Sequence, residues 1–213
     1  MVEWRKRVAV LALALAFIFP GVILVAGALQ SNYSLFNAVS GLGAPDAVMP
    51  GLLNIAGFGL AGFLMILFVT AVWPVLRADV LGVATAVLLI LTGISLIGAG
   101  LFHCDPGCPI AGASPRGMAH HLFAVVLLLF AALTPWLTAV YQSQMGGHGR
   151  FVSLSLIVGA VLLGLFALTP LVLWLGWAGV QQRLFLVIYL GWLVGYGRIT
   201  LQQLADLEQA AGK

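Results

Sequence analysis

Charged residues are scarce in this chain: Asp, Glu, Lys and Arg make up only 7% of its 213 residues. Soluble domains carry about a quarter charged residues, so these few charges cannot cover a water-facing surface. The formal net charge is only +3 and the basic residues form no patch, which argues against nucleic-acid binding. No Asp, Glu or Lys lies in the middle of an apolar run. Ion-driven transport normally requires such intramembrane groups, so the sequence argues against it as well.

Apolar residues are abundant instead, at 62% of the chain, with a mean hydropathy of +1.15. A helix needs roughly 20 apolar residues to cross the hydrocarbon core of a bilayer. Runs of this kind lie near 8–29, 50–75, 80–102, 118–141, 151–175 and 184–205. The first follows Arg5-Lys6-Arg7 as a secretory signal would, but it is too long for a signal core, so we expect it to stay as a span. We therefore predict one all-α domain, residues 1–213, an integral membrane bundle of six transmembrane helices.

The basic residues predict the orientation of this bundle, because Lys and Arg near span ends are retained on the cytoplasmic side. Arg116 and Arg183 fall on one side of the predicted bundle. The others fall on the opposite side: Arg5, Lys6, Arg7, Arg77, Arg150, Arg198 and Lys213. Both termini are therefore predicted to be cytoplasmic, in a multi-pass protein of the cell (plasma or inner) membrane.

The last span carries an aromatic stripe and continues into an amphipathic tail. Tyr189, Trp192 and Tyr196 follow the spacing of one helix face, which is typical of packing between helices. Beyond Arg198, leucines keep helical spacing while Gln, Asp and Glu fill the other positions, so we expect a surface helix at the inner face.

Most of the unusual polar residues lie in the two long outward connections, 30–49 and 103–117. These connections are rich in Gly, Pro, Ser, Asn and Asp, which favour turns. The candidate site residues at this end of the bundle are Ser40, Asp46, Asn54, His103, Asp105 and His120. Of the adjacent His120 and His121, we expect His120 to face the interior, because Ala124, Leu127 and Leu128 lie on its side of the helix.

Three interpretations of these polar residues stay open. Imidazole and carboxylate groups bind zinc and act as acid–base pairs, which predicts a catalytic or metal site. In that case His103, Asp105 and His120 hold a divalent metal such as zinc, and Asp46 acts as a base. Alternatively, the same groups cap helix ends and form a structural hydrogen-bond network, or contact a ligand without chemistry, as Ser40 and Asn54 could.

Cys104 and Cys108 flank Asp-Pro-Gly in the second outward connection. A disulfide is expected if the Pro106-Gly107 turn brings the two α-carbons within about 7 Å. The oxidising compartment predicted for this side favours the bond, while free thiols or metal ligands are the alternatives. Arg116 and Arg183, the outward cations, could bind a lipid phosphate, pair with an outward aspartate or simply reach the headgroup layer.

Four motifs together resemble a known family. They are Tyr33-Ser34, Ser40-Gly-Leu-Gly-Ala-Pro, the run from Gly98 through His103-Cys-Asp-Pro to Gly107, and Gly179-Val-Gln-Gln-Arg183. They resemble the prokaryotic membrane family called domain of unknown function 998. The resemblance covers nearly the whole chain and implies a six-helix membrane protein without specifying an activity. The occurrence of two cysteines together is not a general feature of that family.

A more distant similarity is to the alkaline ceramidase and adiponectin-receptor superfamily. Those intramembrane hydrolases hold zinc with several histidines and an aspartate beside a serine, and similar residue types occur here in Ser40, Asp46, His103, Asp105 and His120. The chain departs from that pattern because its fifth and sixth spans contain no histidine.

Three functions are compatible with these observations. The first is a metal-assisted hydrolase or transferase acting on lipids. The second is a protein that binds or transports a lipid headgroup or a small molecule without chemistry. The third is an accessory subunit of a membrane complex. The sequence does not decide whether the protein is an enzyme.

Overall fold

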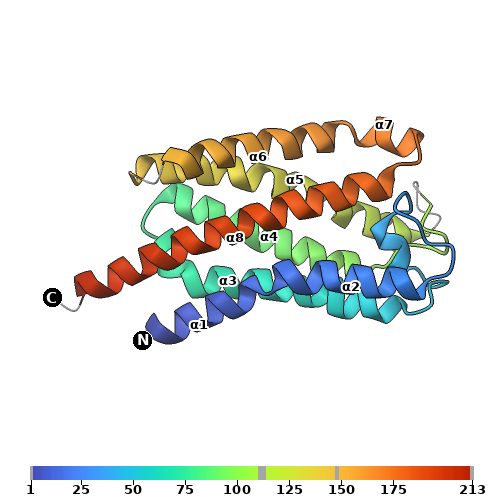
Figure 1. Ribbon diagram of the computed structural model, residues 1–213, viewed down its shortest axis with the longest axis horizontal. Helices are drawn as coiled ribbons and strands as arrows, with labels where there is room; N and C mark the ends of the chain where they lie inside the picture. Colours follow the sequence, from blue (N-terminus) through green and yellow to red (C-terminus); the bar gives the residue numbers. More distant parts are fainter. Residues whose placement is uncertain (1, 110–113, 147–148, 212–213) are drawn as a thin grey trace.

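The computed structural model describes residues 2–109, 114–146 and 149–211, and these ranges contain helices and connections but no strand. Lys213 lies outside them. Six helical stretches are long and apolar enough to cross a membrane: Glu3–Leu29, Leu52–Leu76, Val80–Leu101, Pro115–Gln144, Gly149–Ala167 and Ala178–Leu207. They run side by side, and both termini lie at the same end of the bundle (Figure 1). The prediction of an all-α bundle of six spans is thus confirmed.

The first two spans each contain a change in helix geometry. Helix α1 (Val2–Leu13) and helix α2 (Leu15–Leu29) form the first span and meet at Ala14, whose N–H bonds three residues back to Leu11 O at 3.0 Å. The second span begins as a π-helix, η2 (Leu52–Gly59), and continues as the α-helix α3 (Leu60–Leu76). Hydropathy alone predicted neither change.

Helix α4 (Val80–Leu101) returns beside α3 after a short link. Asp79 starts α4, since its carboxylate accepts a hydrogen bond from Leu81 N at 2.7 Å. Gly62 of α3 and Gly93 of α4 face each other so closely that a Cβ on either one would collide with the other's carbonyl oxygen. This approach of two backbones is how small residues pack helices in a membrane.

The second half of the chain forms α5 (Pro115–Gln144), α6 (Gly149–Ala167), α7 (Thr169–Trp174) and α8 (Ala178–Ala211). The prediction of one continuous span over 151–175 is wrong, because α6 ends at Ala167 and the short α7 follows. Pro170 lies in the first turn of α7, where the N–H that proline lacks is not needed for a helical hydrogen bond. Helix α8 extends six residues past the predicted end at 205, as the leucine spacing of the tail suggested.

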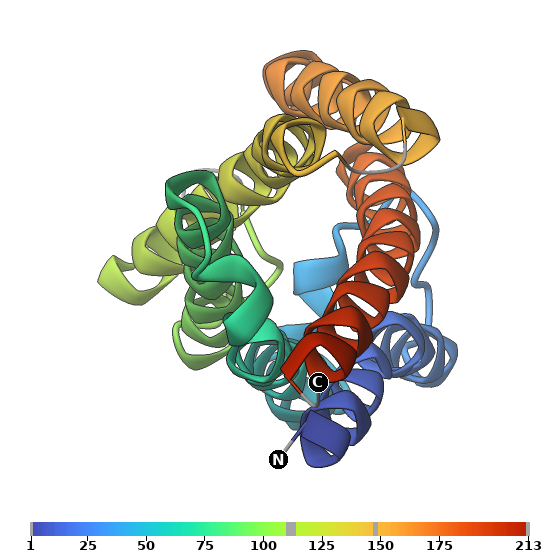
Figure 2. The same ribbon diagram turned by 90° about the vertical axis from the view of Figure 1, so that its left-hand side faces the viewer.

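Seen from the end that carries both termini, α6 packs between α5 and α8, while α8 also contacts α1 and α3 (Figure 2). The aromatic stripe of α8 is buried in this arrangement, and the rings of Trp192 and Tyr196 stack at 5.4 Å. Trp192 Nε1 donates to Ser155 Oγ of α6 at 2.9 Å. The stripe is therefore a packing surface, as predicted.

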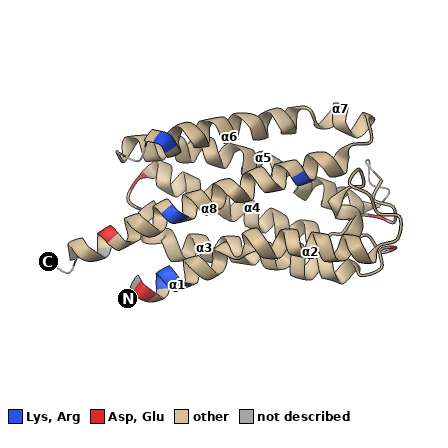
Figure 3. Ribbon diagram, viewed as in Figure 1, with Lys and Arg blue, Asp and Glu red and all other residues tan. Residues whose placement is uncertain are grey.

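The charged residues divide between the two ends. Lys and Arg colour α1, the start of α6 and the middle of α8 toward the terminal end, with one further basic position on α8 near the other end (Figure 3). The orientation was predicted from this unequal distribution of Lys and Arg between the two ends. The cytoplasmic location of the termini stays a prediction.

Candidate ligand-binding site

The end of the bundle opposite the termini is covered by the connection between α2 and η2, which contains the short helix η1 (Val39–Gly43). The amide of Val39 donates to Gln182 Oε1 of α8 at 2.7 Å. The carboxylate of Asp46 accepts from Gly107 N, at 3.1 and 3.0 Å to its two oxygens. These bonds join two connections that are far apart in the sequence, and helix α8, into one cover.

Arg183 fastens the same cover to α8. Its guanidinium donates to Leu35 O at 2.9 Å, to Asn37 O at 3.1 Å and to Tyr33 Oη at 2.6 Å, and it lies over the Tyr33 ring. Burial raises the pKa of the Tyr33 hydroxyl above its usual value, and the charge of Arg183 partly offsets this. Arg183 thus binds backbone carbonyls of the cover, and not the lipid phosphate considered above.

Asp105 lies at the start of α5. Its carboxylate accepts from Ser114 N at 2.9 Å and from Ser114 Oγ, and Ser114 Oγ in turn accepts from Gly117 N at 3.1 Å. A Cβ on Gly117 would collide with the Asp105 carboxylate. The aspartate therefore organises a helix N-terminus, where acceptors of N–H groups are favourable.

His103 pairs with Arg116, the other cation at this end of the bundle. Arg116 Nη1 lies 3.1 Å from His103 Nε2, and His103 Nδ1 lies 3.1 Å from Cys104 O. Because a guanidinium and a carbonyl have fixed roles, Nε2 accepts and Nδ1 carries the proton. Both ring nitrogens of His103 are thereby used.

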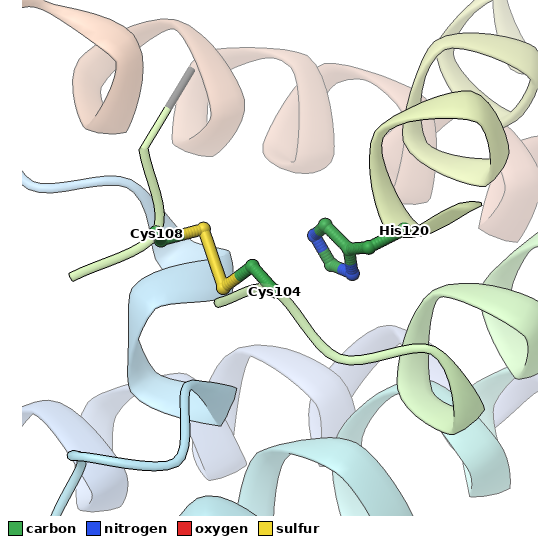
Figure 4. Close-up of side chains that lie close together, drawn as sticks. All are labelled: Cys104, Cys108 and His120. Atoms are coloured by element: carbon green, nitrogen blue, oxygen red, sulfur yellow. A yellow bond between two sulfur atoms is a disulfide. The ribbon is translucent and has the colours of Figure 1, made fainter. Parts of the chain in front are cut away.

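His120 is buried in the bundle, with 1% of its surface exposed, which confirms the expected orientation of the two adjacent histidines. Its Nδ1 lies 2.9 Å from Ala99 O and must donate to it, so Nε2 is left as the acceptor. The imidazole points toward the Cys104–Cys108 pair (Figure 4). His121 Nε2 instead donates to Pro109 O at 2.8 Å.

A disulfide joins Cys104 to Cys108, whose α-carbons are 5.1 Å apart, so the predicted bond is confirmed. Ser40 touches both sulfurs: its carbonyl oxygen lies 3.3 Å from Cys104 Sγ and its hydroxyl 3.4 Å from Cys108 Sγ. Among the described residues, one group of metal-binding side chains converges, and it consists of Cys104, Cys108 and His120, with ligand atoms within 4.8 Å of one another. The predicted set of His103, Asp105 and His120 does not converge in this way.

Two adjoining cavities lie beneath the cover. The outer one, about 420 Å³, is lined by polar side chains that include Gln30, Asn32, Tyr33, Asn37 and Asp46. The inner one, about 110 Å³, is lined mainly by apolar side chains of α2, η2, α4, α5 and α8. Four residues line both cavities: Ser40, His120, Ala124 and Gln182. They therefore mark the junction between a polar space and an apolar one.

The lining of the two cavities differs from the predicted site. Ser40, Asp46 and His120 line a cavity, whereas Asn54, Arg116 and Arg183 are absent from the linings found in the described part of the chain. Asn54 donates to Gly43 O at 2.8 Å and so supports η1. Gln182 was not among the predicted site residues, although it belongs to the same Gly179-Val-Gln-Gln-Arg183 motif as Arg183.

Together, the fold and these cavities define a polytopic α-helical membrane protein with a pocket at the end opposite its termini. The chain belongs to the family described as Protein of unknown function (DUF998), whose model matches residues 8–199. This confirms the resemblance found in the sequence. Neither a curated protein nor a solved structure matches the chain.

Proposed function

We propose that the protein binds an amphiphile, with an uncharged polar head in the outer cavity and an apolar chain in the inner cavity. The observation that carries this proposal is the shared lining of the two cavities by Ser40, His120, Ala124 and Gln182. A molecule that spans this junction contacts polar groups at one end and apolar groups at the other. Small-molecule sites commonly combine an apolar lining with a few polar groups that fix the orientation of the ligand.

The polar lining favours a head that forms hydrogen bonds and carries no negative charge. The side-chain amides of Gln30, Asn32, Asn37 and Gln182 offer both donors and acceptors. Asp46 is the charged residue among the described lining side chains, and a carboxylate repels an anionic head. A hydroxyl-bearing head, such as that of a glyceride, is therefore the chemical class that fits.

The inner cavity suits a hydrocarbon chain. Phe19, Leu96, Leu127 and Phe185 are among its lining residues. Each methylene that moves from water into such an environment contributes about 0.8 kcal/mol. For a ligand that arrives from the bilayer this gain is small, so the polar contacts decide which molecule binds.

A metal-assisted hydrolase has less support. His103 and Asp105 are engaged with Arg116 and Ser114, and their ligand atoms do not converge with those of His120. A metal centre built from the predicted set would require these contacts to be exchanged. Binding without chemistry requires no such exchange.

The test uses Ala124, which lines both cavities, and Val125, which is 50% exposed on the same helix. The purified protein is titrated with a monoacylglycerol, and with the lysophosphatidate of the same chain, while binding is followed by native mass spectrometry. We expect one monoacylglycerol per protein and weaker binding of the anionic lipid. Ala124→Phe fills the junction and lowers monoacylglycerol affinity at least about tenfold, whereas Val125→Phe leaves it unchanged. Equal affinity in both variants, or preference for the anionic lipid, contradicts the proposal.

A further inference from the structure

We propose that reduction of the Cys104–Cys108 disulfide creates a Zn²⁺ site, with the two thiolates and Nε2 of His120 as its ligands. The three ligand atoms already lie within 4.8 Å of one another. Two thiolates and an imidazole are ligands that zinc prefers. Cys108 and His120 line the outer cavity, but this inference does not rest on amphiphile binding, because the side chains proposed to bind the polar head are different ones.

His120 is preorganised as a ligand. Its Nδ1 proton is held by Ala99 O at 2.9 Å, which fixes both the tautomer and the ring orientation. Zinc-bound histidines typically donate their second ring nitrogen in this manner. Within the described residues, Nε2 has no hydrogen-bond partner, and the ring is directed at the sulfurs (Figure 4). With Nδ1 engaged by Ala99 O, Nε2 is the ring nitrogen left to bind a ligand.

The sulfur positions need only a small adjustment. The α-carbons of Cys104 and Cys108 are 5.1 Å apart. With Zn–S bonds of about 2.3 Å and tetrahedral angles, two thiolates bound to one ion lie about 3.8 Å apart. Breaking the S–S bond lets rotation about the Cα–Cβ bonds reach this separation without movement of the backbone.

The surroundings suit a neutral metal complex. Cys104 is fully buried, so an isolated charge there would be costly. Two thiolates and one Zn²⁺ sum to zero charge, and the Ser40 hydroxyl, 3.4 Å from Cys108 Sγ, can donate to a thiolate. Because Cys108 and His120 both line the outer cavity, a fourth position is open to a water from that side.

The chemistry balances as a two-electron reduction followed by metal binding. A dithiol donates two electrons and two protons, becomes a disulfide itself and leaves Cys104 and Cys108 as thiols. Zinc binding then releases the two thiol protons. The oxidised protein has no thiolate to offer, so the redox state of the cysteine pair controls whether the metal binds.

The experiment compares the oxidised protein with the reduced protein. The reduced sample is prepared with a phosphine, which is then removed under anaerobic conditions. A phosphine reduces the bond by taking oxygen from water. Co²⁺, as a spectroscopic substitute for Zn²⁺, is titrated into each sample. We expect one equivalent to bind to the reduced protein with a thiolate charge-transfer band, which Zn²⁺ then removes, and no such band in the oxidised protein.

Two variants locate the imidazole ligand. His120→Ala is expected to weaken binding to the reduced protein at least about tenfold, while His121→Ala, whose ring contacts Pro109 O instead, leaves it unchanged. The comparison of the two redox states in the unaltered chain stands even if His120→Ala fails to fold. No band in the reduced protein, the same band in the oxidised protein, or equal loss in both variants overturns the proposal.

Discussion

Gln182 and Arg183 are adjacent residues that attach the outer cover to α8 by different chemistry. The amide of Gln182 accepts one backbone N–H, whereas the guanidinium of Arg183 donates to two carbonyls and one phenol. The rigid fork of a guanidinium suits several acceptors at once, which an ammonium cannot reproduce. At this scale, a residue for which a lipid phosphate was one of the partners considered contributes to the architecture of the pocket.

Replacing Arg183 by methionine tests this role. The variant loses three hydrogen bonds to the cover, and each contributes on the order of 1 kcal/mol, reduced here by partial exposure to solvent. We expect faster hydrogen exchange at the amides of 33–39 and a lower free energy of unfolding. Arg150→Met, at the opposite end of the bundle, is the matched control. Unchanged exchange in Arg183→Met would show that the cover does not depend on this side chain.

The sequence predicts where these residues lie along the chain but not which groups they contact. Hydropathy found the spans, and turn-forming residues located the polar end. The partners of Arg183 lie 146 to 150 positions away in the chain, and no local pattern encodes such a pairing. Asp105 is a second example. Its carboxylate suggested a metal ligand, but in the structure it accepts a hydrogen bond from Ser114 N at the N-terminus of α5.

At the scale of helices, α3 and α4 approach one another through glycine. Because Gly62 and Gly93 leave no room for a Cβ, the two backbones are in direct contact there. Hydropathy predicted both helices but not the wide turns of η2, because helix geometry does not change the apolar composition of a span.

Gly62→Val tests the importance of this contact. The added side chain meets the backbone of α4, and overpacking of this kind costs typically about 1–3 kcal/mol. We expect a lower unfolding temperature in detergent, measured by circular dichroism. Gly164→Val on α6, where nothing lies within 4 Å of the added Cβ, serves as the control. Equal stability of the two variants would mean that the close approach of α3 and α4 is not needed.

At the scale of the whole molecule, most of the Lys and Arg residues lie toward the end that carries the termini (Figure 3), and the cavity with polar lining lies at the other end. The bundle presents apolar side chains on its outer surface and places its inner cavity between helices that include α2, α4, α5 and α8. The outer cavity opens where the headgroup layer would lie if the spans cross the membrane. A ligand with a polar head and an apolar chain would therefore keep the orientation that it has in the bilayer.

The most direct test of amphiphile binding is cross-linking with monoacylglycerols that carry a photoreactive diazirine. The diazirine is placed either beside the head or at the end of the acyl chain. The head probe is predicted to label the cover around residues 30–47, and the chain probe is predicted to label inner-cavity residues such as Phe19, Leu96 and Phe185. Adducts should be mapped by mass spectrometry of the digested protein. Labelling confined to bilayer-facing residues such as Val125 and Val187, or the same pattern from both probes, would contradict the account.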